Sequence, residues 1–451
     1  IRCRDDPANP CAQMLVSSLS VSFAPQLVSR PCVSSSCVRM SAGDSYLSKV
    51  PMGPPDAILG IAEAFKASTV PGKVNVAIGA YRDDQGSPWV LPAVRAAEAK
   101  LIERGENKEY AGIVGLPGFL KVAMRFAYGA DCAALGEGRI AATQTLSGTG
   151  ACRIAGEFYK RYLPEGTQVF LPDPTWGNHV AIMQEAGLEV KRYRYCDRKT
   201  CTLDCAGLLE DIANAPDGSI FLLHACAHNP TGVDPSEAQW DEISQAILKK
   251  GHHVMLDCAY QGFASGDAEK DAFSIRKFLD DGHSLLLAQS FAKNFGLYGE
   301  RVGTLSVVCK DQEEAGRVLS QIKRIIRPMY SSPPIHGALI VDAVLSDEAL
   351  SKQYYEECAQ MAVRIAKMRS LLRENLEAQG SEHDWQRITD QIGMFAYTGM
   401  SGEMCDQLTN EHAIFLTRDG RISLAGINDQ NVEYVAKAIH SVTKGKELGG
   451  L

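Results

Sequence analysis

Residues 219–258 read SIFLLHACAHNPTGVDPSEAQWDEISQAILKKGHHVMLDC, and this stretch decides the fold class. It opens on an apolar run at 219–226 and closes on a second apolar run at 253–256. Between them, residues 236–250 mix polar and apolar side chains as an amphipathic helix does, and Gly251 stops that pattern. Two apolar strands joined by a helix predict parallel neighbours in a sheet that helices cover on both faces.

Similar apolar runs lie on either side of this stretch, at 169–171, 284–288 and 304–308. Together they predict an α/β fold built on a mostly parallel sheet. Such sheets bind ligands beyond the carboxyl ends of their strands, so the residues that follow each run are the candidates for a site. Further along, residues 347–379 contain neither Pro nor Gly and predict one long helix, which leads to a second, smaller domain.

The composition sets broad limits on function. The chain has 451 residues, of which 45% are hydrophobic and 22% charged, which is typical of a globular protein and excludes wholesale disorder. No apolar run approaches the length of about 18 residues that a membrane-spanning helix needs. The formal net charge of −8 argues against broad binding to nucleic-acid phosphates. The 14 cysteines include no C-x-x-C pair, and we interpret them as free thiols.

The amino-terminal segment differs from the rest. Residues 7–43 contain no Asp or Glu, nine of the thirty residues from Met14 to Gly43 are Ser, and Arg30 and Arg39 add positive charge. Acid-poor, Ser-rich leaders with arginine are typical of organelle transit peptides. We therefore expect import into the mitochondrial matrix, with a plastid as the alternative; if the segment is only a disordered tail, the protein stays in the cytosol.

Hydroxyl and cationic residues near the predicted strand ends indicate an anion site. Ser147 and Thr149 lie in a Gly-rich turn before a helix, while Ser290 and Arg301 follow later strands. Such groups, with the N–H groups of a helix start, can hold a phosphate, although the turn alone could be an ordinary helix cap. A dinucleotide is disfavoured because Arg153 fills the third Gly position of G-x-G-x-x-G, so a monophosphate is expected.

Two further residues suggest what carries that phosphate. Asp257 ends an apolar strand, where a carboxylate needs a cationic partner such as a ring nitrogen. Lys293 follows another strand, three residues after Ser290, and is a candidate for a Schiff base. A phosphate site, a lysine and this carboxylate together describe pyridoxal 5′-phosphate, with Trp176 available to stack on its ring.

A metal site is the weaker interpretation of the neighbouring motif. His224, Cys226 and His228 alternate along a predicted strand, where alternate residues share a face and three ligands could align. A fourth ligand is missing at any recognisable spacing, so we expect buried histidines and no metal.

From about residue 50 to 445 the chain resembles aspartate aminotransferases of the mitochondrial type, a branch of the class I aminotransferases. The resemblance rests on long motifs in a fixed order: MGPPDAILG (52–60), GAYRDDQGSPWVLP (79–92), NKEY (107–110), TLSGTGACRI (145–154), PTWGNH (174–179), HACAHNPTGVDP (224–235), DCAYQGFASGD (257–267), QSFAKNFGLYGERVG (289–303), IRPMYSSPP (326–334), DQIGMFAYTG (390–399) and DGRISLAG (419–426).

The resemblance implies a role for each matching residue. Lys293 would bind the cofactor and move the proton, and Asp257, supported by His179, would keep the pyridine nitrogen protonated. Donors to the cofactor's phenolic oxygen would be Tyr260 and Asn229. The phosphate would be held by Ser147, Gly148, Thr149, Ser290 and Arg301, and by Tyr110 from a neighbouring subunit. The substrate would be bound by Arg421, Asn229, Gly79 and Trp176, and by Arg327 from the other subunit.

The implied enzyme is a homodimer of the type I aminotransferase fold that exchanges amino groups between L-aspartate and 2-oxoglutarate, giving oxaloacetate and L-glutamate. An arginine at each end of the substrate would select a dicarboxylate. An aromatic or broad-range aminotransferase is the alternative within the family, and a non-catalytic relative is a further one that the intact Lys293 and Asp257 disfavour. The expected division of the chain is a leader at 1–45, a large cofactor domain at 88–345, and a small domain from 50–87 and 346–451.

Overall fold

The computed structural model describes residues 45–53 and 59–449. The predicted leader lies outside these residues except for its last position. Residues 45–53 belong to a unit of their own, in which the short 3-10 helix η1 (Tyr46–Lys49) begins where the Ser45 side chain accepts the N–H of Leu47. The rest of the described chain forms the second unit.

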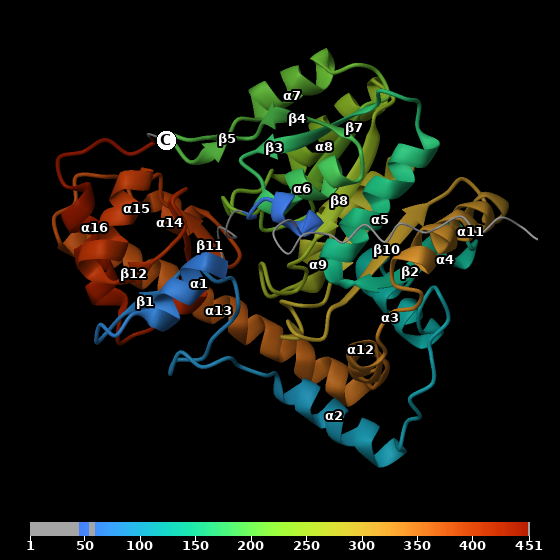
Figure 1. Cartoon of the computed structure of the whole chain (residues 1–451), viewed down its shortest axis with the longest axis horizontal. Helices are drawn as coiled ribbons and strands as arrows, with labels where there is room; N and C mark the ends of the chain where they lie inside the picture. The colour runs from blue at the N-terminus through green and yellow to red at the C-terminus, as the bar shows by residue number, and fades with distance from the viewer. Residues whose placement is uncertain (1–44, 54–58, 450–451) are drawn as a thin grey trace, which may run out of the picture. The chain divides into compact units, whose positions relative to one another are not determined.

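The second unit is built on a seven-stranded sheet (Figure 1) with the strand order β2-β10-β9-β8-β7-β3-β4. Five of its strands, from β9 to β4, run parallel, whereas β10 is antiparallel to both of its neighbours. The mostly parallel sheet is therefore confirmed. Its strands are β2 (Ile140–Leu146), β3 (Gln168–Asp173), β4 (Glu189–Arg194), β7 (Ile220–His224), β8 (His253–Cys258), β9 (Leu286–Ser290) and β10 (Val302–Val308).

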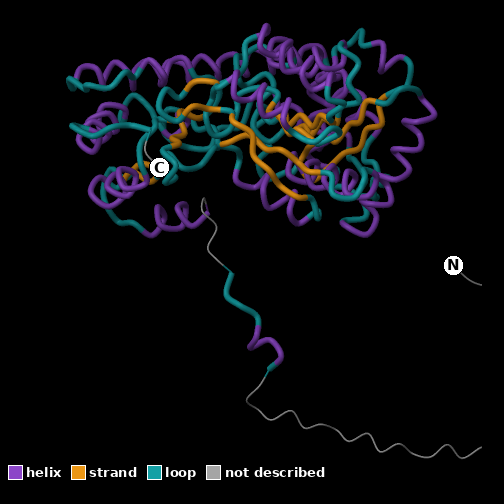
Figure 2. The backbone as a smooth tube through the Cα atoms, turned by 90° about the horizontal axis from the view of Figure 1, so that it is seen from above, coloured by secondary structure: helices purple, strands orange, loops and turns teal. Residues whose placement is uncertain are grey.

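Helices cover both faces of this sheet, as the views in Figures 1 and 2 show. Along β7 the side chains alternate: Ile220 and Leu222 belong to one apolar core, and Phe221 and Leu223 belong to the other. The first core is closed by α5 (Ser147–Tyr162), α6 (Gly177–Glu185) and α11 (Gln312–Met329). The second is closed by α3 (Pro117–Tyr128), α7 (Cys205–Asn214), α8 (Glu237–Lys249), α10 (Phe273–Asp280) and α12 (His336–Ser346).

The two helices predicted at 236–250 and 347–379 are present. Ser236 caps α8 in a capping box with Gln239, and Gly251 has the left-handed φ of +61° that follows its end. The long helix α13 (Glu348–Ala378) has 31 residues and begins where the Asp347 side chain accepts the N–H of Leu350. At 1.5 Å per residue it runs for roughly 46 Å, and it leads from α12 to the carboxyl-terminal elements (Figure 1).

Residues from both ends of the second unit pair with each other. The early strand β1 (Val74–Asn75) is parallel to β12 (Ile414–Phe415), and β11 (Phe395–Tyr397) is antiparallel to β13 (Arg421–Ser423). The expected division into a large and a small domain stays a prediction. The remaining elements are α1 (Leu59–Ala67), α2 (Pro92–Arg104), α4 (Ala133–Gly136), β5 (Cys196–Asp197), β6 (Thr202–Leu203), α9 (Ala268–Asp271), α14 (Gln386–Asp390), α15 (Gly402–His412), η2 (Leu424–Gly426) and α16 (Val432–Thr443).

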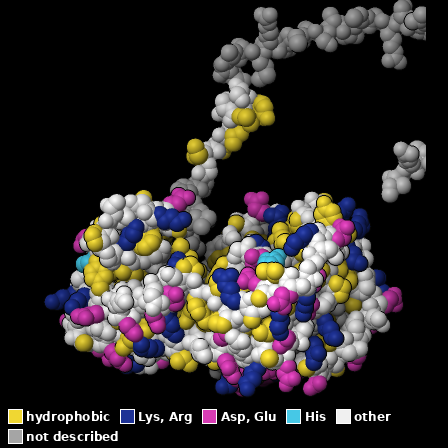
Figure 3. Space-filling model, turned by 90° about the horizontal axis from the view of Figure 1, so that it is seen from below, with side chains coloured by type: hydrophobic (Ala, Val, Ile, Leu, Met, Phe, Trp, Pro, Cys, Tyr) yellow, Lys and Arg dark blue, Asp and Glu magenta, His cyan; other side chains and the backbone are white. Residues whose placement is uncertain are grey.

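The surface and the cysteines add two observations. Lys and Arg side chains are interspersed with Asp and Glu over the face drawn in Figure 3. Within the described ranges, no helix combines the length and the apolar character that crossing a membrane requires. The ten cysteines from Cys132 to Cys405 that the structure describes are free thiols, as interpreted from the sequence.

Candidate active site

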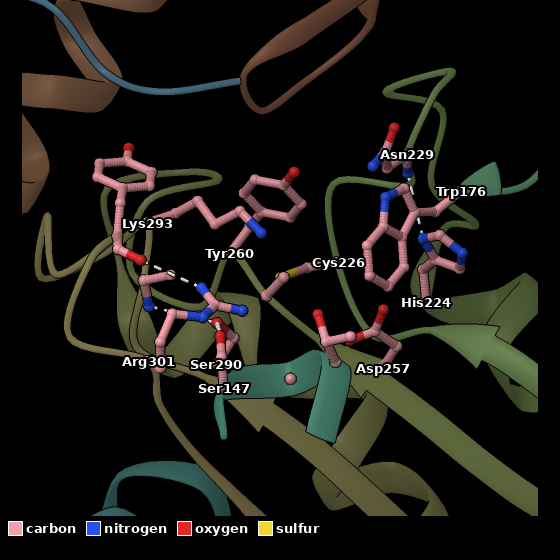
Figure 4. Close-up of a pocket in the computed structure, with 15 residues that line it drawn as sticks. Ser147, Trp176, His224, Cys226, Asn229, Asp257, Tyr260, Ser290, Lys293 and Arg301 are labelled. Carbon is pink, nitrogen blue, oxygen red and sulfur yellow. Dashed lines mark hydrogen bonds between the residues drawn. The ribbon is translucent and has the colours of Figure 1, made fainter. Parts of the chain in front are cut away.

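A cavity of about 240 Å³ lies beyond the carboxyl ends of the parallel strands (Figure 4). Ten of the predicted site residues line it together: Ser147, Gly148, Thr149, Trp176, Asn229, Asp257, Tyr260, Ser290, Lys293 and Arg301. Parallel strands deliver the residues that follow them to one edge of the sheet, which is why segments far apart in the sequence meet here.

One end of the cavity presents only hydrogen-bond donors or hydroxyls. The Ser147 and Ser290 hydroxyls lie 3.1 Å apart, and the exposed Arg301 side chain lies beside them in Figure 4. Helix α5 begins at Ser147, so its first N–H groups are free of helical partners at this end. Ser147 and Arg301 both have left-handed φ values, +61° and +54°, and the Ser147 N–H donates to the Arg301 carbonyl. Such strained backbone is typical of functional sites.

This end is narrow because two glycines let segments approach closely. A Cβ on Gly303 would lie 2.5 Å from the Ser147 carbonyl carbon, and a Cβ on Gly148 would lie 3.2 Å from the Ser290 Cβ. Larger residues at either position would push the start of α5 away from β9 and β10. The donor set and its spacing fit a phosphate group.

Lys293 projects into the middle of the cavity, and its amino group lies 5.2 Å from the centre of the Tyr260 ring. Burial lowers the pKa of Lys293, and the positive charge of Arg301 lowers it further, although Asp257 acts in the opposite direction. A lowered pKa increases the fraction of neutral amine, the nucleophilic form.

Asp257, at the end of β8, lies at the floor of the cavity and is 9% exposed. Its Oδ2 accepts a hydrogen bond of 3.0 Å from Nε2 of the fully buried His179. Burial alone would raise the pKa of Asp257, but the hydrogen bond and the electrostatic effect of His179, followed by those of His224 and Lys293, more than offset it, so the pKa is lowered. The carboxylate is therefore ionised and able to hold a cation.

A hydrogen-bonded chain behind Asp257 fixes the tautomer of His179. The Asn229 N–H donates to Nδ1 of His224 (3.1 Å), so the neutral His224 ring carries its proton on Nε2. That proton is directed to the Thr175 hydroxyl (3.4 Å), which then donates to Nδ1 of His179 (3.0 Å). Burial lowers the pKa of His224 to about 3, which keeps that ring neutral. In this arrangement His179 donates from Nε2 to Asp257.

Arg421 lies behind the cavity at the start of β13 and is 5% exposed. Its guanidinium donates to the Ala77 carbonyl (3.0 Å) and to Oδ1 of Asn229 (3.3 Å), and it stacks 4.3 Å from the centre of the Phe395 ring. Its Nε has no hydrogen-bond partner among the described residues, and burial lowers its pKa. Gly79 packs against the same Phe395 ring, where a Cβ would come within 2.5 Å.

Two predicted site residues lie elsewhere in the same chain. Tyr110 is 86% exposed and lines a separate hollow of about 620 Å³ with Arg327. The exposed Arg327 guanidinium contacts the Ser331 hydroxyl in that hollow. Neither residue lines the cavity of Lys293; Arg421, Gly79 and His179 do not line it either, but Arg421 and His179 hydrogen-bond to residues that do.

The motif considered for a metal does not gather its three side chains around one point. His224 and Cys226 line the cavity, whereas His228 is buried against Tyr195, with the ring centres 3.9 Å apart. Among the described residues, the set of potential ligands within 4.8 Å of one another is instead Cys152, His179 and Asp257. Two members of that set already share the hydrogen bond between His179 and Asp257.

The sequence analysis did not identify three residues that contact the predicted site residues or line the cavity: Tyr298, Thr175 and Phe395. Tyr298 lines the cavity, and its hydroxyl accepts the Tyr81 N–H at 2.8 Å. Thr175 and Phe395 act through contacts with residues distant in sequence, so no local spacing marks them. Tyr298 lies between Lys293 and Arg301, and its position in that loop was the one available signal.

The cavity residues fit pyridoxal 5′-phosphate by their chemistry. The end with donors and hydroxyls suits a phosphate, the ionised Asp257 suits a protonated ring nitrogen, and Trp176 offers an aromatic face on the side of Asp257. Lys293 is the amine within reach of the same space.

Comparison with known proteins places this site in a family. The class I and II aminotransferase profile matches residues 71–439. The chain is 50% identical over 415 residues to the mitochondrial aspartate aminotransferase of Xenopus tropicalis, covering 92% of this chain and 96% of that relative. A solved mitochondrial aspartate aminotransferase from Trypanosoma brucei has 44% identity and a TM-score of 0.83, covering 85% of this chain and all of that one. An aromatic-amino-acid aminotransferase from Burkholderia pseudomallei, covalently bound to pyridoxal phosphate, has 40% identity and a TM-score of 0.86, covering 89% of this chain and all of that one. The chain belongs to the class I and II aminotransferases.

Proposed function

We propose that this protein is an aspartate aminotransferase that uses pyridoxal 5′-phosphate to exchange amino groups between L-aspartate and 2-oxoglutarate. One observation carries the proposal: a partly buried lysine with a lowered pKa lies in one cavity with an anion site of hydrogen-bond donors and hydroxyls and an ionised buried carboxylate. Relatives named as aspartate aminotransferases, at about half identity over nearly the whole chain, support the substrate assignment.

Different residues around the cavity would hold different parts of the cofactor. When bound, the cofactor supplies an electron-accepting pyridinium that stabilises negative charge at the substrate Cα. Asp257 holds the proton on the ring nitrogen, and His179 keeps Asp257 ionised and oriented. The hydroxyls of Ser147, Thr149 and Ser290, with the amides of Gly148 and its neighbours and the guanidinium of Arg301, hold the phosphate.

The proton transfer itself falls to Lys293. With the cofactor bound, the neutral amine of Lys293 would take the proton from the substrate Cα, and the resulting ammonium would hold that proton for return. Tyr260 and Asn229 would donate hydrogen bonds to the cofactor's phenolic oxygen. Trp176 stacks on the ring and closes one side of the substrate space.

The substrate is held by its carboxylates. Arg421, with its unpartnered Nε, binds the α-carboxylate together with Asn229 and the backbone at Gly79. The distal carboxylate is bound by Arg327 of a second copy of the chain, and Tyr110 of that copy reaches the phosphate. We therefore propose a homodimer with shared sites, because Tyr110 and Arg327 are exposed and lie outside the cavity of their own chain.

The decisive experiment measures kcat/KM of the purified, cofactor-loaded protein for aspartate and phenylalanine with 2-oxoglutarate as acceptor, and for glutamate with oxaloacetate as acceptor. Aspartate and glutamate should exceed phenylalanine by at least about tenfold, the value of one charge-assisted hydrogen bond to the distal carboxylate. Equal values would favour the aromatic or broad-range alternative, which the similarity to the Burkholderia enzyme keeps open. Turnover of none of the three would contradict the proposal.

We also propose that the protein acts in the mitochondrial matrix, because its leader is acid-poor and the relatives are named as mitochondrial. A reporter fused to residues 14–45 should enter mitochondria; entry into a plastid would support the alternative, and diffuse cytosolic signal would contradict both.

A further inference from the structure

Helix α13 carries a buried arginine that is not paired with a carboxylate in the described part of the chain. Arg369 is 4% exposed, and burial lowers its pKa. Its guanidinium donates to three backbone carbonyls, those of Ile388 (2.8 Å), Gly393 (2.7 Å) and Phe395 (2.6 Å). A buried charge is costly unless its partners are held in good geometry, so these contacts fix the three carbonyls relative to α13.

The three carbonyls lie in α14 (Ile388), in the segment 391–394 that joins α14 to β11 (Gly393), and at the first residue of β11 (Phe395). The other side of this segment packs on the loop that carries Asn229: the Ile392 N–H donates to the Gly232 carbonyl at 2.8 Å, and a Cβ on Gly393 would lie 2.5 Å from the Ala227 Cβ. The segment therefore has almost no room to shift toward that loop, and Arg369 prevents it from shifting away.

The segment is followed by Phe395, which is the contact between Arg369 and the substrate site. The carbonyl of Phe395 is bound by Arg369, while its ring lies under the Arg421 guanidinium at 4.3 Å and against the backbone of Gly79. Phe395 therefore contacts Arg369 through its backbone carbonyl, and its ring contacts Arg421 and Gly79, two of the proposed α-carboxylate ligands.

We infer that Arg369 is a positioning residue for the α-carboxylate site: by holding the backbone of residues 393–395, it sets the Phe395 ring and, through it, the placement of the Arg421 guanidinium. The inference rests on the proposed function. It assigns Arg369 no contact with substrate or cofactor.

The test is Arg369→Met, which keeps the length of the side chain and removes all three hydrogen bonds. Aspartate, alanine and phenylalanine share the α-carboxylate, so KM should rise for all three by about ten- to hundredfold, while kcat changes by less than about threefold. The affinity for succinate, measured by calorimetry, should fall to the same extent. Arg369→Lys keeps the positive charge but loses the forked guanidinium. Its KM values and its succinate affinity should therefore lie between those of the wild type and those of Arg369→Met.

Arg373→Met is the matched control. Arg373 lies one turn further along α13, is partly exposed and pairs with Glu377 and Thr389, so its removal takes a cation from the same helix without freeing residues 393–395. Its KM values and succinate affinity should remain those of the wild type.

Phe395→Leu separates positioning from simple loss of stability. It should raise KM as Arg369→Met does, and the double variant should be no worse than the stronger single variant, because both changes act on one contact.

Wild-type KM values in folded Arg369→Met would overturn the inference, even if thermal unfolding occurs at a lower temperature. Failure of both Arg369 variants to fold would overturn it too, since Arg369 would then serve the fold. Arg421→Ala keeps the two proposals apart: if it leaves succinate binding unchanged, the proposed carboxylate site itself is wrong.

Discussion

The cavity around Lys293 and the hollow around Arg327 differ in how many hydrogen-bond partners a single chain supplies to the residues that line them. In and beside the cavity, side chains hydrogen-bond to one another: Asp257 with His179, Ser147 with Ser290, and Arg421 with Asn229. In the hollow, Tyr110 and the Arg327 side chain face solvent, and Arg327 contacts only the Ser331 hydroxyl among the described residues. Under the proposed function, one chain prearranges the cofactor and α-carboxylate ends, whereas selection by the distal carboxylate would need Arg327 of a second copy.

The largest effect should come from the centre of the cavity. Lys293→Ala should lower turnover by at least about 10²- to 10⁴-fold, because the group that moves the Cα proton is lost. The variant should also lose any cofactor attachment that borohydride can reduce, measured by mass spectrometry. Lys270→Ala, an exposed lysine in α9, serves as the control and should behave as the wild type. Turnover near the wild-type rate in Lys293→Ala would rule out this mechanism.

Substitution of Arg327 in the hollow should lower activity less than Lys293→Ala does, and the size of the effect should depend on the substrate. Arg327→Ala should lower kcat/KM for aspartate and glutamate by about ten- to hundredfold, but leave alanine and phenylalanine nearly unchanged. Mixing inactive Lys293→Ala chains with Arg327→Ala chains should restore aspartate turnover above that of either alone, because one interface then contains both intact residues. Absence of recovery after verified subunit exchange would show that each site is built from one chain.

The buried chain behind Asp257 should affect the pH dependence of stability. Because the pKa of His224 is about 3 in the folded protein and ordinarily 6.5, the unfolded protein binds more protons between these values. The free energy of unfolding therefore falls as pH decreases through this window, by about 2 kcal/mol between pH 7 and pH 5 from this group. In denaturant titrations of His224→Gln, the free energy of unfolding should fall between pH 7 and pH 5 by about 2 kcal/mol less than it does in the wild type. An identical pH dependence would mean that His224 is protonated in the fold.

The smallest effect should come from one link in that chain. Thr175→Val keeps the shape but removes the hydroxyl between His224 and His179, so the tautomer of His179 is no longer fixed. One net hydrogen bond is worth about 1 kcal/mol, so kcat should fall by about fivefold. Thr200→Val, at an exposed hairpin, is the control and should leave kcat unchanged. A loss as large as that of Lys293→Ala would show that Thr175 acts directly on the reaction.

Much of the cavity could be predicted because its residues follow strands whose apolar character is local. The run SIFLLHAC and the run ending at Asp257 identify neighbouring strands, and the residues after them must then meet at one sheet edge. The same reasoning failed for Thr175 and Phe395, whose contacts depend on how distant segments pack. His224 and His228 are both buried, as expected from the sequence, with ring centres 4.2 Å apart, but the sequence did not predict that His228 also stacks on Tyr195.

The sequence by itself determined the parallel sheet, the capped helices α8 and α13, and the identity of the residues at the cavity, because hydrophobic period, caps and strand ends are properties of short segments. Only the tertiary structure decided which of those residues share a cavity, how the tautomer of His179 is fixed, and that Arg327 and Tyr110 lie apart from Lys293. Those outcomes depend on burial and on contacts between segments tens to hundreds of residues apart, such as Arg421 with Ala77. No local pattern encodes them, because each hydrogen bond is fixed by the packing of the whole unit.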